Sequence, residues 1–179
     1  MDINFLVKIT SRAWALPILA LMHSGVPGRQ AVLLAKTGAG RTAFAQSLAH
    51  LVELGLVERT PGHGHPLRPE YRLTDAGQAA GALAGRINAA TPLLGEAPLL
   101  RRVWTVPILA VSHQPRFFTD IKKALPPITD RALSKSLKDL ERNDWLRRDI
   151  DAAVHPPRAR YLAVNAGASI GTAVSLDAA

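Results

Sequence analysis

The sequence contains no cysteine in 179 residues, and only 5% of its residues are aromatic. Without cysteine, disulfide bonds, thiolate nucleophiles and thiol redox switches are excluded, and we expect a cytoplasmic protein. Long hydrophobic runs are also missing. The longest run, residues 13–22, contains Pro17 and is well short of the roughly 20 residues that a membrane-spanning helix needs. Residues 1–11 lack an apolar core for export. We therefore expect neither secretion nor a membrane partner.

Motifs typical of catalysis and metal binding are missing as well. The chain has no Gly-x-Ser-x-Gly elbow and no acidic pair set in an apolar stretch beside a base. Residues 35–42 resemble a phosphate-binding loop, but Ala35 and Arg41 stand where such a loop needs glycine and lysine. His63 and His65 alternate as two metal ligands could, yet no third ligand is nearby in sequence. We therefore expect no enzyme, no cofactor and no bound metal.

What the sequence does contain is an internal repeat. Residues 12–77 recur in degenerate form at 102–167, with offsets of 89 or 90. The matched pairs include Arg12 with Arg102, Trp14 with Trp104, His23 with His113, Leu48 with Leu137, Tyr71 with Tyr161, and Gly77 with Gly167. The offset changes only in two segments where loops are expected. The chain thus contains two copies of one small domain. We predict domains at 1–77 and 101–179, joined by a helical linker at 78–100.

The chain is basic, with a net charge of +8 and a sequence pI near 10.6. Residues 1–77 hold eight basic and five acidic residues, and residues 101–179 hold thirteen and eight, so both repeats are positive. This balance favours a polyanionic partner. Charge alone does not choose nucleic acid over a membrane surface, and a basic surface without any partner is also an ordinary outcome.

Hydrophobic periodicity predicts three helices followed by two strands in each repeat. In the second repeat an apolar helix covers 103–112, and a short amphipathic helix ends at Pro126 and Pro127. Thr129 is a good N-cap for the third helix. Leucines stripe one face of that helix, at Leu133, Leu137 and Leu140. The predicted strands cover 145–150 and 160–164, and in the first repeat 56–60 and 70–74.

The second repeat resembles the HxlR family of bacterial winged-helix transcription regulators, which is related more distantly to the MarR type. The residues that carry the resemblance are Trp104, Phe118, Ile121, Ala124, Leu125, Pro126, Ile128, Leu133, Leu137, Leu140, Leu146, Arg148, Pro157, Arg158, Tyr161 and Gly167. In the first repeat, residues 27–37 lack the aromatic and the Ala-Leu-Pro ending of the second helix, but the wing matches closely. The resemblance implies an α+β, mainly helical fold of two tandem winged helix-turn-helix domains.

The chain departs from the family in two respects. It lacks the family's frequent cysteine near the N-terminus, and it carries two domains where members usually have one. Family members normally dimerise through terminal helices. Here residues 75–97 join the two domains, and their small apolar residues are suited to a packed covalent bridge. We therefore expect a single-chain pseudo-dimer, either monomeric or assembled further into a homodimer of chains.

The fold that the resemblance implies assigns the polar residues of each third helix, the recognition helix, to double-stranded DNA. Expected DNA contacts on the two recognition helices are Arg41, Thr42, Gln46, Arg131, Ser134, Lys135 and Lys138, with Arg68, Arg158 and Arg160 from the wings. Arg41 and Arg131 are the best candidates for contact with base edges, because a guanidinium fork suits guanine. For each of these residues, phosphate contact or a merely solvated position is the alternative.

We therefore expect a DNA-binding transcription regulator, acting as a repressor because blocking a promoter requires only occupancy. The recognition helices differ in sequence, so one chain should prefer an asymmetric site. Trp14 and Trp104 are most simply core anchors, but they can also line a ligand cavity. The alternative function is therefore a protein that sequesters a small aromatic molecule and no longer binds DNA. A DNA-binding architectural protein is a third hypothesis, and a small-molecule effector is compatible with the first.

Overall fold

The computed structural model describes residues 2–61, 69–91, 97–152 and 155–174. The chain packs as two compact units, one formed by residues 9–89 and the other by residues 1–8 with 90–179. Helix α1 (Ile3–Thr10) begins the described chain. No single described helix is long and apolar enough to span a membrane, although α1 and the next helix, bent by 99° at their break, pass that test of length and composition as a pair.

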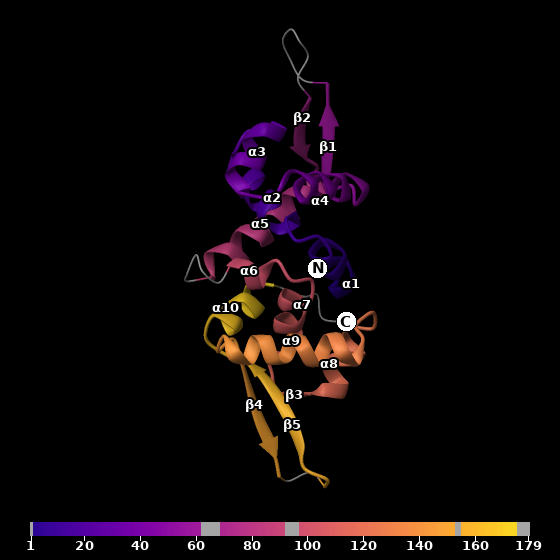
Figure 1. The fold of residues 1–179 in the computed structure, drawn as a ribbon, viewed down its shortest axis with the longest axis vertical. Coiled ribbons are helices and arrows are strands. Elements are labelled where there is room, and N and C mark those ends of the chain that lie inside the picture. Colours follow the sequence, from indigo (N-terminus) through magenta and orange to yellow (C-terminus); the bar gives the residue numbers. More distant parts are fainter. Residues whose placement is uncertain (1, 62–68, 92–96, 153–154, 175–179) are drawn as a thin grey trace. The chain divides into compact units, whose positions relative to one another are not determined.

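The unit of residues 9–89 contains three helices, a hairpin and a final helix (Figure 1). Its elements are α2 (Ala15–His23), α3 (Gln30–Thr37), α4 (Arg41–Glu53), β1 (Val57–Thr60), β2 (Glu70–Leu73) and α5 (Asp75–Ala89). Gly38 ends α3 in the left-handed conformation, with φ of 67°, which glycine adopts without steric cost. The strands β1 and β2 are antiparallel, and their hairpin projects away from the helices of the unit.

The unit completed by residues 90–179 has the same order with one additional strand. Its elements are α6 (Ala97–Leu100), α7 (Thr105–Val111), β3 (Arg116–Phe117), α8 (Phe118–Ala124), α9 (Asp130–Arg142), β4 (Leu146–Asp151), β5 (Arg158–Ala163) and α10 (Asn165–Ala173). The three strands form an antiparallel sheet in the order β3-β5-β4. The hairpin of β4 and β5 extends beyond α9 as the wing of this unit (Figure 1).

The predicted order of helices and hairpins is confirmed, but the prediction omitted the short strand before α8 and the helix α10 after the second wing. Arg116 and Phe117 pair with Tyr161 and Arg160. In the first copy the same place is held by a single bridge between Arg29 and Glu70. A strand of two residues has no hydrophobic period of its own, and only its long-range partner defines it. The strands β4 and β5 also lie one or two residues away from their predicted limits.

Residues 78–89, predicted as the start of a linker, complete α5. That helix packs on α2 within the first unit and buries Ala80, Leu83, Ala84 and Ile87. In the other unit α10 packs on α7 in the same way and buries Ile170. Each packing unit therefore includes a helix after its wing, and the first unit extends beyond the predicted boundary at residue 77.

Glycines show that the repeat persists at the level of backbone contacts. A Cβ atom on Gly77 would overlap the carbonyl oxygen of Leu56, and a Cβ atom on Gly167 would overlap that of Trp145. These pairs are equivalent in the two copies. A second equivalent pair continues the pattern, because Gly81 lies against the backbone of Leu19 and Gly171 against that of Leu109. The helix after each wing thus approaches its unit so closely that no side chain fits between them.

Candidate nucleic-acid interface

Helix α9 has a buried apolar face and an exposed cationic one, as predicted. The hydroxyl of Thr129 accepts a hydrogen bond from the Ala132 amide at 3.2 Å, which caps the first turn. Leu133, Leu137 and Leu140 are buried. The outer face is formed by the exposed residues Arg131, Ser134, Lys135 and Lys138. Within the described part of the chain, the three cations of this face form no ion pair, so their charge faces solvent uncompensated.

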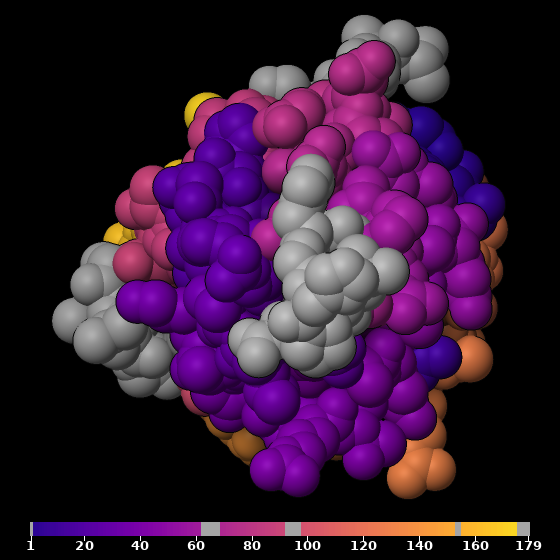
Figure 2. Space-filling model, turned by 90° about the horizontal axis from the view of Figure 1, so that it is seen from above, coloured from indigo at the N-terminus to yellow at the C-terminus, as the bar shows by residue number. Residues whose placement is uncertain are grey.

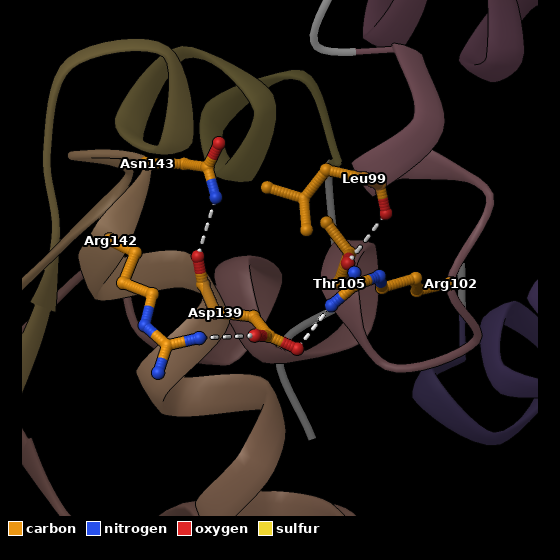
Figure 3. A network of polar contacts seen from close by, with 6 residues as sticks. All are labelled: Leu99, Arg102, Thr105, Asp139, Arg142 and Asn143. Carbon is orange, nitrogen blue, oxygen red and sulfur yellow. Dashed lines mark hydrogen bonds and ion pairs between the residues drawn. The ribbon is translucent and has the colours of Figure 1, made fainter.

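Asp139 connects α9 to the segment that precedes α7 (Figure 3). The Arg102 guanidinium donates to one carboxylate oxygen of Asp139, and Arg142 Nη1 lies 3.6 Å from the other. The Asn143 amide donates to the Asp139 carbonyl at 2.7 Å, and the side chain of Asp139 is only 16% exposed. Sequence reasoning missed this residue. The one indication in the sequence was that an acidic residue stands directly beside the buried leucines of an otherwise basic helix.

The wing of the second unit carries both free and paired arginines. Arg158 is exposed at the start of β5 and has no ion pair among the described residues. Arg160 Nε lies 3.4 Å from Asp151 Oδ2, on the neighbouring strand. Arg147 Nε donates to Asp149 Oδ2 at 2.8 Å. Of the two predicted wing arginines, Arg158 therefore presents more uncompensated charge, whereas Arg160 already has an anionic partner.

Helix α4 of the first unit presents a different surface. It buries Phe44, Leu48 and Leu51 and exposes Arg41, Thr42 and Gln46, the predicted DNA contacts. Its exposed surface also includes the apolar residues Ala45, Ala49 and Val52. Gly40 provides no side-chain cap to this helix. The predicted wing residue Arg68 lies outside the described residues, as do His63 and His65.

The most buried tryptophan, Trp145, is not one of the two that recur in the repeat. Trp14 and Trp104 are half-buried at the N-caps of α2 and α7. Trp145 is 1% exposed, directly after α9, and occupies the place of Leu56 in the first copy. The Nδ1 atoms of His23 and His113 lie 3.4 Å from Gln78 Oε1 and 3.1 Å from the Ala110 carbonyl oxygen.

Comparison with known families follows the same division of the chain. A family model described as HxlR-like helix-turn-helix matches residues 9–89 and, a second time, residues 99–176. The chain belongs to the HxlR-like helix-turn-helix family. The HxlR-like matches cover each unit from before its tryptophan-led helix to the helix after its wing, so α5 and α10 are parts of the family domain. The predicted resemblance and the tandem arrangement are confirmed.

Relatives of this HxlR-like chain are described as uncharacterized HTH-type transcriptional regulators. One from Mycobacterium tuberculosis is 39% identical over 72 residues, covering 40% of this chain and 45% of the relative. One from Mycobacterium bovis is 38% identical over 72 residues, which again cover 40% of this chain and 45% of the relative. The chain thus spans about half the length of the curated relatives it matches. The reduced form of the transcriptional regulator YodB from B. subtilis is 26% identical, with a TM-score of 0.41 over 46% of this chain and 81% of that one.

Proposed function

We propose that the chain is a sequence-specific, double-stranded DNA-binding transcription regulator of the bacterial cytoplasm, acting as a repressor. The observation that carries this proposal is the exposed cationic face of α9 in an HxlR-like domain. Arg131, Lys135 and Lys138 follow helical spacing along one side, opposite the buried leucines. A helix with one such face can enter the major groove, which is about 12 Å wide. The proposal assigns no catalytic role to any residue.

The individual contacts follow from position and chemistry. Arg131 and Arg41 lie in the first turns of their helices, where recognition helices meet base edges. Ser134, Lys135 and Lys138 extend the contact on α9, and Thr42 and Gln46 extend it on α4. Wing arginines suit phosphates or the minor groove. Arg158, with no ion pair in the described chain, is the stronger wing contact, and Arg68 remains a proposal from sequence.

The two recognition helices differ in sequence, so the proposed site for one chain is asymmetric. We further propose that the two domains of one chain act in place of two protomers. A dimer of chains would instead read a palindrome. Sedimentation of the protein with and without its DNA site distinguishes these two assemblies, because one chain per site is expected in the first and two in the second.

The decisive experiment is binding of the purified chain to genomic and random duplex fragments across a salt series. Selective binding should weaken with salt, and Arg131→Ala should lower the affinity by about 1–3 kcal/mol. Lys135→Ala should reduce the salt slope by about 0.9 if its phosphate contact is lost. Arg86→Ala, on α5, removes the same charge outside the proposed interface and should change little. Weak retention that is equal for all duplexes and all variants would contradict the proposal.

A second function is favoured by the outer face of α4. Ala45, Ala49 and Val52 give that helix an apolar surface where α9 carries Ser134, Lys138 and Glu141. A duplicated winged-helix protein with such a surface can hold a small molecule, either as the effector of a regulator or for sequestration alone. If no selective DNA binding is found, sequestration becomes the preferred function. Trp14 and Trp104 remain proposed lining residues for a ligand cavity.

A further inference from the structure

Both units have a surface pocket at the same place, between the recognition helix, the first residue of the preceding helix and the wing. The pocket of the first unit has a volume of about 390 Å³, and that of the second about 260 Å³. Three equivalent pairs line both pockets: Leu48 and Leu137, Arg59 and Arg148, and Tyr71 and Tyr161. The two pockets can therefore be compared residue by residue, because duplication produced them from one sequence.

The remaining lining residues differ between the two pockets, and those on the recognition helix are more apolar in the first. Where the second pocket has Ser134, Lys138 and Glu141, the first has Ala45, Ala49 and Val52. The aromatic residue Phe118 that opens α8 is replaced by Gln30, which opens α3. The first pocket thus has less polar side chains on its recognition helix and the smaller Gln30 in place of Phe118, and it is the larger of the two. Val52 is 38% exposed, one of the two exposed large hydrophobic residues of the described chain.

A neighbouring pocket of about 340 Å³ shares Gln30, Arg59 and Tyr71 with the first one and continues it along Ala31 and Val32. Arg59 and Tyr71 thus line both parts of one groove in the first unit. This unit is coloured indigo to magenta in Figure 2. The Tyr71 amide donates to the Gly28 carbonyl at 2.8 Å. This hydrogen bond connects the strand that carries Tyr71 to the residues just before α3.

Arg59 has the properties of an anion-binding group. It faces Tyr71 directly across the hairpin, so both side chains lie on one face of the strands. No carboxylate of the described chain is paired with it. Of the two nearby acids, Glu70 pairs with Arg29 at 3.1 Å. Glu53 also lines the first pocket; it lies 3.9 Å from His50, and its side chain is 76% exposed to solvent. The groove therefore combines the apolar side chains of α4 with the exposed Arg59 guanidinium, which has no ion pair in the described chain, whereas the Arg29 guanidinium that also lines it is paired with Glu70.

We propose that this groove of the first unit binds a small aromatic carboxylate. The carboxylate accepts the paired N–H donors of Arg59, while the ring lies against Tyr71 and the apolar side chains of α4. The equivalent pocket of the second unit does not fit such a ligand, because Lys138 and Glu141 replace its apolar wall. A ligand in the groove covers the outer face of α4 beside the wing and so competes with DNA there. This last consequence rests on the proposed function, whereas ligand binding itself does not.

The test is calorimetric titration of the full chain, without DNA, using 2-naphthoate and its neutral analogue 2-naphthamide. We expect one saturable site with a Kd below about 1 mM for the acid and at least about tenfold weaker binding of the amide. Arg59→Gln should weaken the acid about tenfold or more and leave the amide unchanged. The double variant A49K/V52E gives the groove the second unit's residues and should abolish binding. Arg148→Gln is the matched control and should have no effect.

Saturable binding that survives A49K/V52E or R59Q, or that R148Q removes, overturns the assignment of the site. Absence of saturable binding to the folded chain overturns the proposal altogether. Ala49 and Val52 are exposed, so the double variant should retain the wild-type circular dichroism spectrum and melting curve, which are measured alongside. DNA retention by the same preparations reports on the proposed function separately. Naphthoate binding without any DNA binding supports the ligand site and contradicts the regulator.

Discussion

At the scale of single residues, the close approach of glycine to a carbonyl is the feature that both copies preserve. Gly77 and Gly167 each lie in the first turn of the helix after a wing, against the backbone that follows the recognition helix. A methyl group at either place has no room without movement of the main chain. The steric requirement explains why glycine stands at both positions.

Gly77→Ala should therefore destabilise the first unit by about 1–3 kcal/mol through overpacking. Gly85→Ala is the matched control in the same helix, because its Cβ would meet only the His23 ring at 3.9 Å. That control should be neutral or stabilise by roughly 0.5–1 kcal/mol, as alanine is the better helix former. Urea unfolding of both variants, followed by circular dichroism, measures the difference. Equal midpoints for the two variants would refute the steric explanation.

At the scale of elements, the two recognition helices are held in different ways. Helix α9 has a side-chain cap at Thr129 and the Asp139 ion pairs, whereas α4 begins at an uncapped glycine. His50 of α4 stands where α9 has Asp139, and its Nε2 lies 3.2 Å from the Ser11 hydroxyl. Both helices are thus connected to the segment before the tryptophan-led helix of their own unit, one by charge and one by a hydrogen bond.

Thr129→Ala should destabilise the second unit by about 1 kcal/mol, because the Ala132 amide loses its acceptor at the helix start. Thr129→Ser keeps an acceptor in place and should lie close to the wild type. Thermal melting of the three proteins gives the comparison. A threonine-to-serine change as harmful as the alanine change would show that methyl packing, and not capping, stabilises this turn.

We expect the Arg102–Asp139 ion pair to contribute more to the free energy of unfolding than the exposed Arg147–Asp149 pair. A double-mutant cycle with Arg102→Met and Asp139→Asn should give a coupling of about 0.5–1 kcal/mol, since Asp139 is mostly shielded from water and Arg102 is not. The Arg147–Asp149 pair, with both side chains more than half exposed, serves as the control and should give a coupling near zero. Equal couplings in low and high salt would contradict an electrostatic origin.

At the scale of the whole molecule, positive charge is distributed unequally between the two recognition helices. The outer face of α9 has three cations, while α4 has only Arg41 at its start, followed by the uncharged residues Thr42 and Gln46 and by exposed apolar residues. In a DNA complex, phosphate contacts would then come mainly from residues of the second unit. Duplication thus leaves two domains of one family with different surfaces, a cationic one on α9 and a more apolar one on α4.

Exchanging residues between the two helices tests this division. Lys138→Ala should lower the affinity for any duplex and reduce the salt slope by about 0.9, the effect of one lost phosphate contact. Ala49→Lys, the reciprocal change at the equivalent position, should raise both quantities if α4 also approaches DNA. Filter binding across a salt series provides both slopes. A decrease caused by Lys138→Ala without any increase caused by Ala49→Lys would place the DNA contact in the second unit alone.

Much of the fold could be predicted from local signals. Pro126 and Pro127 end a helix wherever they stand, Thr129 caps the next one, and Leu133, Leu137 and Leu140 define its buried face. Exposure of the candidate DNA contacts on α4 and α9 followed from the same periodicity. The repeat itself was visible because equivalent residues recur at a nearly constant offset, and the family matches confirm it.

Other features depend on partners distant in sequence and could be recognised only in the folded chain. Arg116 and Phe117 form a strand because β5 lies beside them, and Asp139 binds Arg102 because α9 packs on α7. The larger groove around Arg59 arises from four separate segments that meet in space.

The sequence by itself thus determined the number of domains, the order of their helices and wings, and the faces that water or the core would cover, because these depend on periodicity, capping and charge along the chain. Only the tertiary structure decided which polar groups pair, how closely the last helix of each unit approaches the backbone, and that the two equivalent pockets differ in volume. Those properties depend on distances between residues that the chain order does not encode locally.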